Sequence, residues 1–225
     1  MATIIEHKKM TPLRPELTPL PPRMIGLPVD ERGYPVPWFV PWHDGKPEFR
    51  AMDARKWVRA VKQKLCWVCG GRLGQHSAFV VGPMCLVNLT NSEPPSHLQC
   101  ATWSAINCPF LSRPRMVRRE NDLPEETEGP AGIAITRNPG VSAVYVTPDY
   151  RVFEDGSGKP LIRVSSICEQ VEWYAEGRPA TRAEVEHSIE TGLPILMAIA
   201  HEEGPEAVAE LKARAKAVER WLPER

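Results

Sequence analysis

The clearest amphipathic pattern in the chain begins after Asp53 and runs to about Lys64. The apolar positions at three- and four-residue steps are Trp57, Val58, Val61 and Leu65. The basic positions on the other face are Arg55, Arg59 and Lys62, with Lys56 and Lys64 nearby. This spacing is the period of a helix, and aspartate is a favoured residue at a helix start. The pattern predicts a helix with one face for packing and one basic face.

From residue 131 onward the pattern changes to short apolar runs separated by turn residues. We expect strands over residues 131–136, 141–147, 150–153 and 160–164. Turns are marked by Gly140, by Pro148-Asp149 and by the glycine-rich stretch 155–158. An antiparallel β-meander is the simplest arrangement of strands with such short connections.

The last 45 residues or so follow a helical period. Thr181 and Glu184 have the spacing of a capping box, and the helix that they open is expected to stop at Gly192, before Pro194. A short apolar helix is expected over 195–200, and Gly204-Pro205 opens a third helix. Its apolar positions are Val208, Leu211, Ala215, Val218 and Leu222. This face is expected to pack on the sheet or on a second copy of the chain, giving a homo-oligomer.

The chain before the amphipathic helix is rich in proline. Residues 1–30 are predicted to form an extended arm, and Tyr34–Met52 a β-hairpin with strands at 38–40 and 48–50 around Asp44-Gly45. Residues 112–130 pass from arginines to acids and are predicted to be a charged linker or loop. We therefore expect an α+β protein with the arm 1–30, a hairpin, basic helix and Cys/His module over 31–111, the linker, and a β-meander with C-terminal helices over 131–225.

Composition and charge restrict the classes of function. The chain has 225 residues, 42% of them hydrophobic, and 28 basic residues balance 28 acidic ones. Zero net charge argues against a general nucleic-acid coat but allows a local basic patch. No apolar run is long enough to span a membrane, and the first ten residues lack the apolar stretch of a signal peptide. A cytoplasmic protein with reduced thiols is expected.

Five of the six cysteines lie between positions 66 and 108. Cys66-x-x-Cys69, followed by Gly70-Gly71, can direct two thiolates at one ion from a tight turn, and His97-x-x-Cys100 supplies a second pair at one-turn helical spacing. Tetrahedral, sulfur-rich sites favour zinc. Either Cys85 or Cys108 is an alternative to His97 as fourth ligand. An iron–sulfur cluster, or reduced cysteines without a metal, are the other interpretations of this pattern.

A closed site of four protein ligands leaves zinc no open position to activate water, which argues against metal catalysis. The chain also lacks a Walker loop, a His-Glu-x-x-His motif and a Gly-x-Ser-x-Gly motif. His76 is the one nearby histidine for a zinc-containing HNH-type nuclease, but no adjacent aspartate supports it.

The leading hypothesis is a non-enzymatic, zinc-stabilised protein that binds nucleic acid or a host protein through Arg55, Arg59 and Lys62. The alternative is a small-molecule or nucleotide-processing enzyme with a pocket between the sheet and the C-terminal helices.

Four short motifs carry a resemblance: Cys-Trp-Val-Cys-Gly at 66–70, Gly-Pro-Met-Cys at 82–85, Glu-Pro-Pro-Ser-His-x-x-Cys at 93–100 and Cys-Pro-Phe-Leu at 108–111. Together they resemble a group of uncharacterised bacteriophage and bacterial proteins, over about residues 33–115. The group carries no established activity, so the resemblance implies only a phage or prophage origin.

Overall fold

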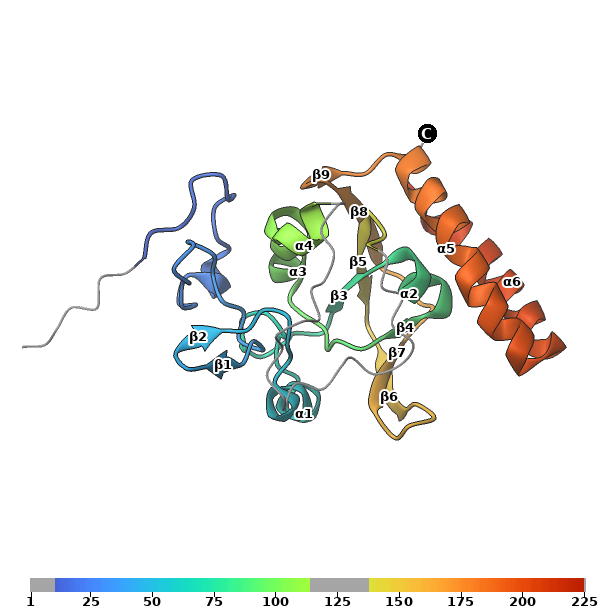
Figure 1. Ribbon diagram of the computed structural model, residues 1–225, viewed down its shortest axis with the longest axis horizontal. Helices are drawn as coiled ribbons and strands as arrows, with labels where there is room; N and C mark the ends of the chain where they lie inside the picture. Colours follow the sequence, from blue (N-terminus) through green and yellow to red (C-terminus); the bar gives the residue numbers. More distant parts are fainter. Residues whose placement is uncertain (1–10, 114–137, 225) are drawn as a thin grey trace, which may run out of the picture.

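The computed structural model describes residues 11–113 and 138–224 and shows a mixed α and β protein with antiparallel sheets (Figure 1). The first described part contains η1 (Pro22–Met24), β1 (Trp42–His43), β2 (Lys46–Pro47), α1 (Ala54–Gln63), β3 (Ser77–Val81), α2 (Pro83–Asn88), β4 (Thr90–Asn91), α3 (Leu98–Asn107) and α4 (Pro109–Ser112). The second contains β5 (Ser142–Thr147), β6 (Tyr150–Glu154), β7 (Pro160–Val164), β8 (Gln170–Ala175), β9 (Arg178–Pro179), α5 (Arg182–Glu203), α6 (Pro205–Val218) and η2 (Glu219–Trp221). The predicted strand over 131–136 and residues 114–130 of the predicted linker lie outside the described residues.

The described residues form two larger sheets and one short hairpin, with strand orders β3-β5-β8-β9, β4-β7-β6 and β1-β2. The antiparallel pairing agrees with the prediction, but the strands do not follow one another in a single meander, because β5 pairs with β3 and β8 while β6 and β7 belong to the other sheet. Every residue of β5 is buried, so this strand needs a neighbour on each edge. Segments 31–111 and 131–225 therefore share both sheets.

Several predicted boundaries were wrong. The hairpin exists at Asp44-Gly45, but its strands have two residues each, and the predicted strands at 38–40 and 48–50 are turns and irregular chain. The predicted helix end at Gly192 is absent: α5 continues through Gly192 and Pro194. A Cβ at Gly192 would lie 2.9 Å from the Met84 side chain, so this glycine lets α5 approach α2 closely rather than ending the helix.

Both predicted helix caps are confirmed. Asp53 accepts hydrogen bonds from the backbone N–H groups of Arg55 and Lys56 at the start of α1, and Thr181 and Glu184 form the capping box of α5. Within α1, Trp57 and Ala60 face the core, whereas Val58 is 44% exposed, contrary to the prediction. The indole of Trp57 donates to the carbonyl of Ser92, which turns this face of the helix inward.

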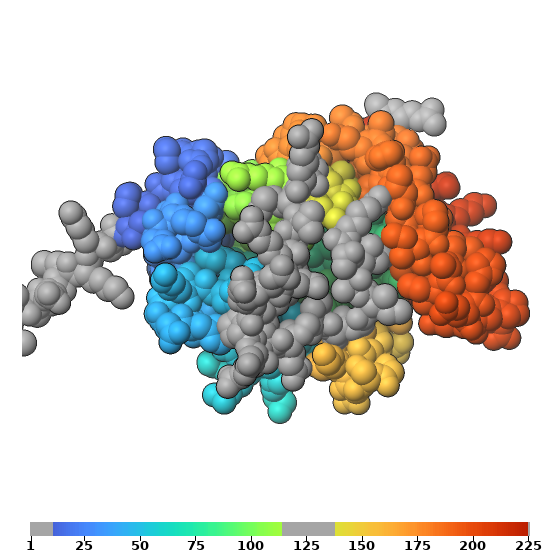
Figure 2. Space-filling model, in the orientation of Figure 1, coloured from blue at the N-terminus to red at the C-terminus, as the bar shows by residue number. Residues whose placement is uncertain are grey.

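The largest core lies between the sheets, α1 and the α5–α6 helical hairpin, which stands at the right of Figure 1. In Figure 2 the N-terminal part and the C-terminal helices occupy opposite ends of the molecule. None of the helices in the described ranges is both long enough and apolar enough to cross a membrane.

Candidate metal centre

The first half of the candidate site is a tight loop after α1. Cys66 N–H donates to the carbonyl of Gly71 at 2.7 Å, and Gly70 N–H donates to the carbonyl of Cys66 at 2.8 Å. Gly70 has a φ of +71°, and a Cβ there would lie 2.7 Å from Cγ of Trp38. The loop can therefore close only with glycine at this position. It turns the backbone N–H of Cys69 toward Cys66 Sγ, at 3.4 Å.

The second half comes from the start of α3, where His97 is the residue before the first helical turn and Cys100 lies in that turn. The flanking backbone is fixed on both sides: Ser96 exchanges two hydrogen bonds with Ala78 of β3, and Trp67 N–H donates to the carbonyl of Pro95. The last of these bonds ties the two halves of the site directly to each other.

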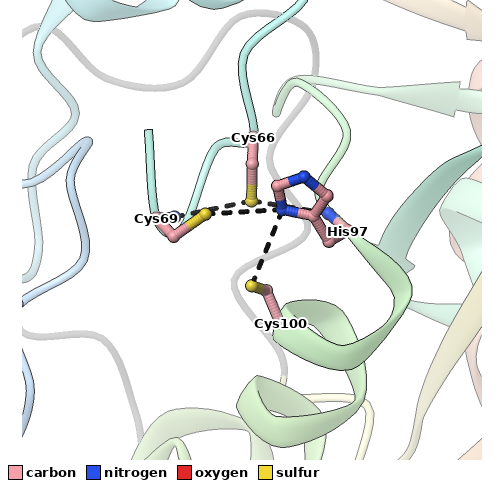
Figure 3. A group of neighbouring side chains, drawn as sticks. All are labelled: Cys66, Cys69, His97 and Cys100. Carbon is pink, nitrogen blue, oxygen red and sulfur yellow. Dashed lines mark hydrogen bonds between the residues drawn. The ribbon is translucent and has the colours of Figure 1, made fainter. Parts of the chain in front are cut away.

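The ligand atoms of Cys66, Cys69, His97 and Cys100 all lie within 4.8 Å of one another, and their side chains point toward a common centre (Figure 3). His97 Nδ1 lies 3.4 Å from Cys69 Sγ and 3.9 Å from Cys100 Sγ. His97 Nε2 lies 2.8 Å from the carbonyl oxygen of Arg72. Because a carbonyl can only accept, Nε2 carries the proton and the lone pair of Nδ1 faces the sulfurs. This arrangement can hold a metal ion.

The pKa values of the site's thiols also support a metal site. The pKa of Cys66 is held well below its usual range, because the Cys100 and Cys69 thiols and the backbone N–H groups of Cys69 and His97 donate to its sulfur. The pKa of Cys100 is raised, because its thiol is hydrogen-bonded to the Cys66 and Cys69 sulfurs and its loss of a proton would bring like charges together. All three can become thiolates together only around a cation.

The remaining cysteines in the structure lie elsewhere. Cys85 is on α2, Cys108 is at the end of α3, and neither belongs to the group of four, so His97 rather than either alternate completes it. Burial raises the pKa of both thiols, as it does for Cys168. These three cysteines behave as small, protonated apolar side chains.

The basic residues predicted on α1 are exposed on a helix that leads directly into the metal-site loop. The guanidinium of Arg59 lies 5.5 Å from the ring centre of Trp38, which is also the ring that contacts Gly70. The same ring faces Lys56 at 5.9 Å. Trp38 thus connects the basic face to the metal-site loop, although no sequence signal indicates this contact.

One contact of His76 was not predicted from the sequence. His76 lies before β3 and Glu169 before β8, and His76 Nδ1 is 2.6 Å from a Glu169 carboxylate oxygen; the partner that the sequence neighbourhood lacks comes from far along the chain. A pocket of about 480 Å³ also lies between β8, β9 and the C-terminal segment after α6. Its lining includes Glu172, Trp173, Tyr174, Arg220 and Trp221.

Comparison of the chain with protein-family models, with curated proteins and with solved structures finds no match in any of the three. Its function therefore has to be argued from the geometry of its own residues.

Proposed function

We propose that Cys66, Cys69, His97 and Cys100 hold a structural zinc ion, and that the protein stabilised by this ion binds nucleic acid through α1. Three thiolates and one imidazole are a common ligand set of structural zinc, and a four-ligand site is closed to substrates. A site of reduced thiolates also fits a cytoplasmic location. Elemental analysis of the purified protein is expected to give one zinc per chain, with no visible absorbance. Iron with a visible chromophore would contradict the zinc assignment.

The observation that supports nucleic-acid binding is the lack of ion pairs on the basic face of α1. Within the described residues, no acidic side chain forms an ion pair with Arg55, Arg59 or Lys62. Several other arginines are paired with carboxylates: Arg32 with Asp30, Arg50 with Glu48, Arg178 with Glu184, Arg182 with Glu186 and Arg214 with Glu210. In a protein of zero net charge, this is a local cationic surface suited to a row of phosphates.

Charge reversal tests this proposal. The triple variant Arg55→Glu, Arg59→Glu, Lys62→Glu should lose binding to single- and double-stranded oligonucleotides, measured by fluorescence anisotropy. For the milder triple change to glutamine, the slope of log K against log salt should fall by about 0.9 for each duplex phosphate that the protein no longer neutralises.

The control makes the same change in net charge elsewhere, with Arg23→Glu, Lys212→Glu and Lys216→Glu, which replace exposed side chains. It should retain most of the affinity. Unchanged binding in the α1 variant would contradict the proposal. If the unmodified protein binds no oligonucleotide at low salt, a host protein becomes the partner to seek on the same face.

A second candidate function rests on the pocket of about 480 Å³ between the sheet and the C-terminal segment. Its volume is within the range of small-molecule sites, and its lining combines aromatic rings with a guanidinium and carboxylates. A small molecule or nucleotide that co-purifies with the protein, identified by mass spectrometry after denaturation, would favour this function over nucleic-acid binding.

A further inference from the structure

A second group of cations lies far from α1 in the sequence, on the β6–β7 hairpin. Arg151 of β6 and Arg163 of β7 are direct cross-strand partners, so their side chains leave the same face of the sheet. Like charges in directly opposite positions destabilise a strand pair. The side chain of Arg214, from α6, reaches the same place: Arg163 and Arg214 both donate to the carbonyl oxygen of Asn88, at 2.8 and 3.4 Å.

The positive charge of this group is only partly balanced. Glu210 forms an ion pair with Arg214. Arg163 contacts the Asn88 carbonyl and the ring of Phe153, whose centre is 5.1 Å from its guanidinium carbon. Within the described residues, the side chain of Arg151 forms no hydrogen bond or ion pair. Burial lowers the pKa of Arg163, and the charges of Arg214 and Arg151 lower it further. Three guanidinium groups thus face one carboxylate.

These arginines lie outside the buried apolar clusters. On β7, Ile162 and Val164 point to the opposite face and are buried at 0% and 3% exposure, whereas Arg151 is exposed. The hairpin reaches the molecular surface at the lower edge of Figure 2. Arg151 is therefore open to solvent, Arg163 and Arg214 are half-buried, and each guanidinium has more N–H donors than its contacts use.

We propose that Arg151, Arg163 and Arg214 form a binding site for a phosphate group. The planar fork of a guanidinium matches the oxygens of a phosphate, and a dianion between the three side chains would remove their mutual repulsion. The phosphate can belong to a nucleic-acid backbone or to a free phosphorylated small molecule. The site stands on its own contacts and does not depend on the proposed role of α1.

Thermal unfolding in inorganic phosphate and in sodium chloride, at equal ionic strength, tests the site. The unmodified protein should unfold at about 2–4 °C higher in phosphate. Arg151→Gln should lose this rise, yet in chloride it should be no less stable than the unmodified protein, because one of the repelling charges is gone. Arg214→Gln should also lose the rise, and Arg23→Gln, which alters an exposed cation on η1, should retain it.

Phosphate also stabilises proteins generally by exclusion from their surface. Comparison with the variants therefore separates binding at this site from the general effect. An equal rise in Arg151→Gln and in the unmodified protein, or no rise in either, would overturn the proposal. If the rise is lost and oligonucleotide binding is weakened as well, the phosphate belongs to nucleic acid. If the rise is lost and oligonucleotide binding is unchanged, the ligand is a free phosphorylated compound. Reversal of charge on α1 tests the proposed function separately.

Discussion

The region around the candidate metal centre and the region of the sheets are held together differently. The buried cluster beside the centre is small: Met24, Cys66, Val68, Cys100 and Trp103. The strands nearby, β1 and β2, have only two residues each, and much of the chain around them is irregular. The sheets contain strands of five and six residues and share a much larger apolar core with α1, α5 and α6. The first region is therefore expected to depend on a metal cross-link, and the second on apolar burial.

The loop that carries Cys66 joins these two regions. Cys66 and Val68 belong to the small cluster, whereas Leu65 and Trp67 belong to the large core. Trp67 stacks on Phe39 with ring centres 4.7 Å apart. The described part of the N-terminal arm, residues 11–30, packs on the small cluster, and the indole of Trp103 donates to the carbonyl of Thr18. Loss of the metal should first loosen the arm and this loop, while the sheets remain folded.

The largest expected effect is that of Cys66→Ser. Removing a fully buried thiolate ligand should abolish metal binding and lower the free energy of unfolding by about 4 kcal/mol. Metal content and urea denaturation followed by tryptophan fluorescence would measure both. Cys168→Ser is the matched control, since Cys168 lies outside the group of four, and it should keep the metal. If Cys66→Ser protein still carried a full complement of metal, the first region would not depend on this ligand, and the contrast between the two regions would fail.

Gly70→Ala should have a smaller effect that also distinguishes the regions. The added Cβ would meet the Trp38 ring at 2.7 Å, and φ at this position is +71°. We expect a loss of about 2 kcal/mol in stability and weaker metal binding, measured by competition with a chromogenic chelator. Gly74→Ala is the control in the same segment, because nothing lies within 4 Å of its Cβ, and it should change stability by less than about 0.5 kcal/mol. Equal losses in both variants would argue against a strained turn at Gly70.

The sequence predicted those features that depend on residues close together. The two ligand pairs, the caps at Asp53 and Thr181, and the turn at Asp44-Gly45 all rest on contacts within a few residues, so spacing alone indicates them. The grouping of the two candidate ligand pairs was predicted because one tetrahedral metal ion takes four such ligands.

Features that depend on distant residues could not be predicted. Nothing local indicates that β5 pairs with β3 rather than with β6, or that Glu169 reaches His76. Gly192 has the same local signal whether it ends a helix or admits Met84, and the position of α2 decides between them. The arginine group has no sequence motif, since the turn joining β6 and β7 and the packing of α6 bring its members together.

The smallest expected effect concerns the C-terminal region. Its stability should depend on pH through the capping box of α5 rather than through metal binding. The Arg178 guanidinium, with the backbone N–H of Thr181, lowers the pKa of Glu184 to about 2 from an ordinary value of 4.5. Since the folded pKa is depressed, this carboxylate stabilises the fold above about pH 4.5 and the benefit is lost as pH falls toward 2. Glu184 is partly exposed, so Glu184→Gln should cost only about 0.5–1 kcal/mol at pH 7. Urea denaturation of both proteins at pH 7 and pH 3 measures the difference, which should shrink at the lower pH. Protonation of the candidate metal ligands affects both proteins alike and cancels, so a difference that grows in acid would contradict the stabilising role of this charge.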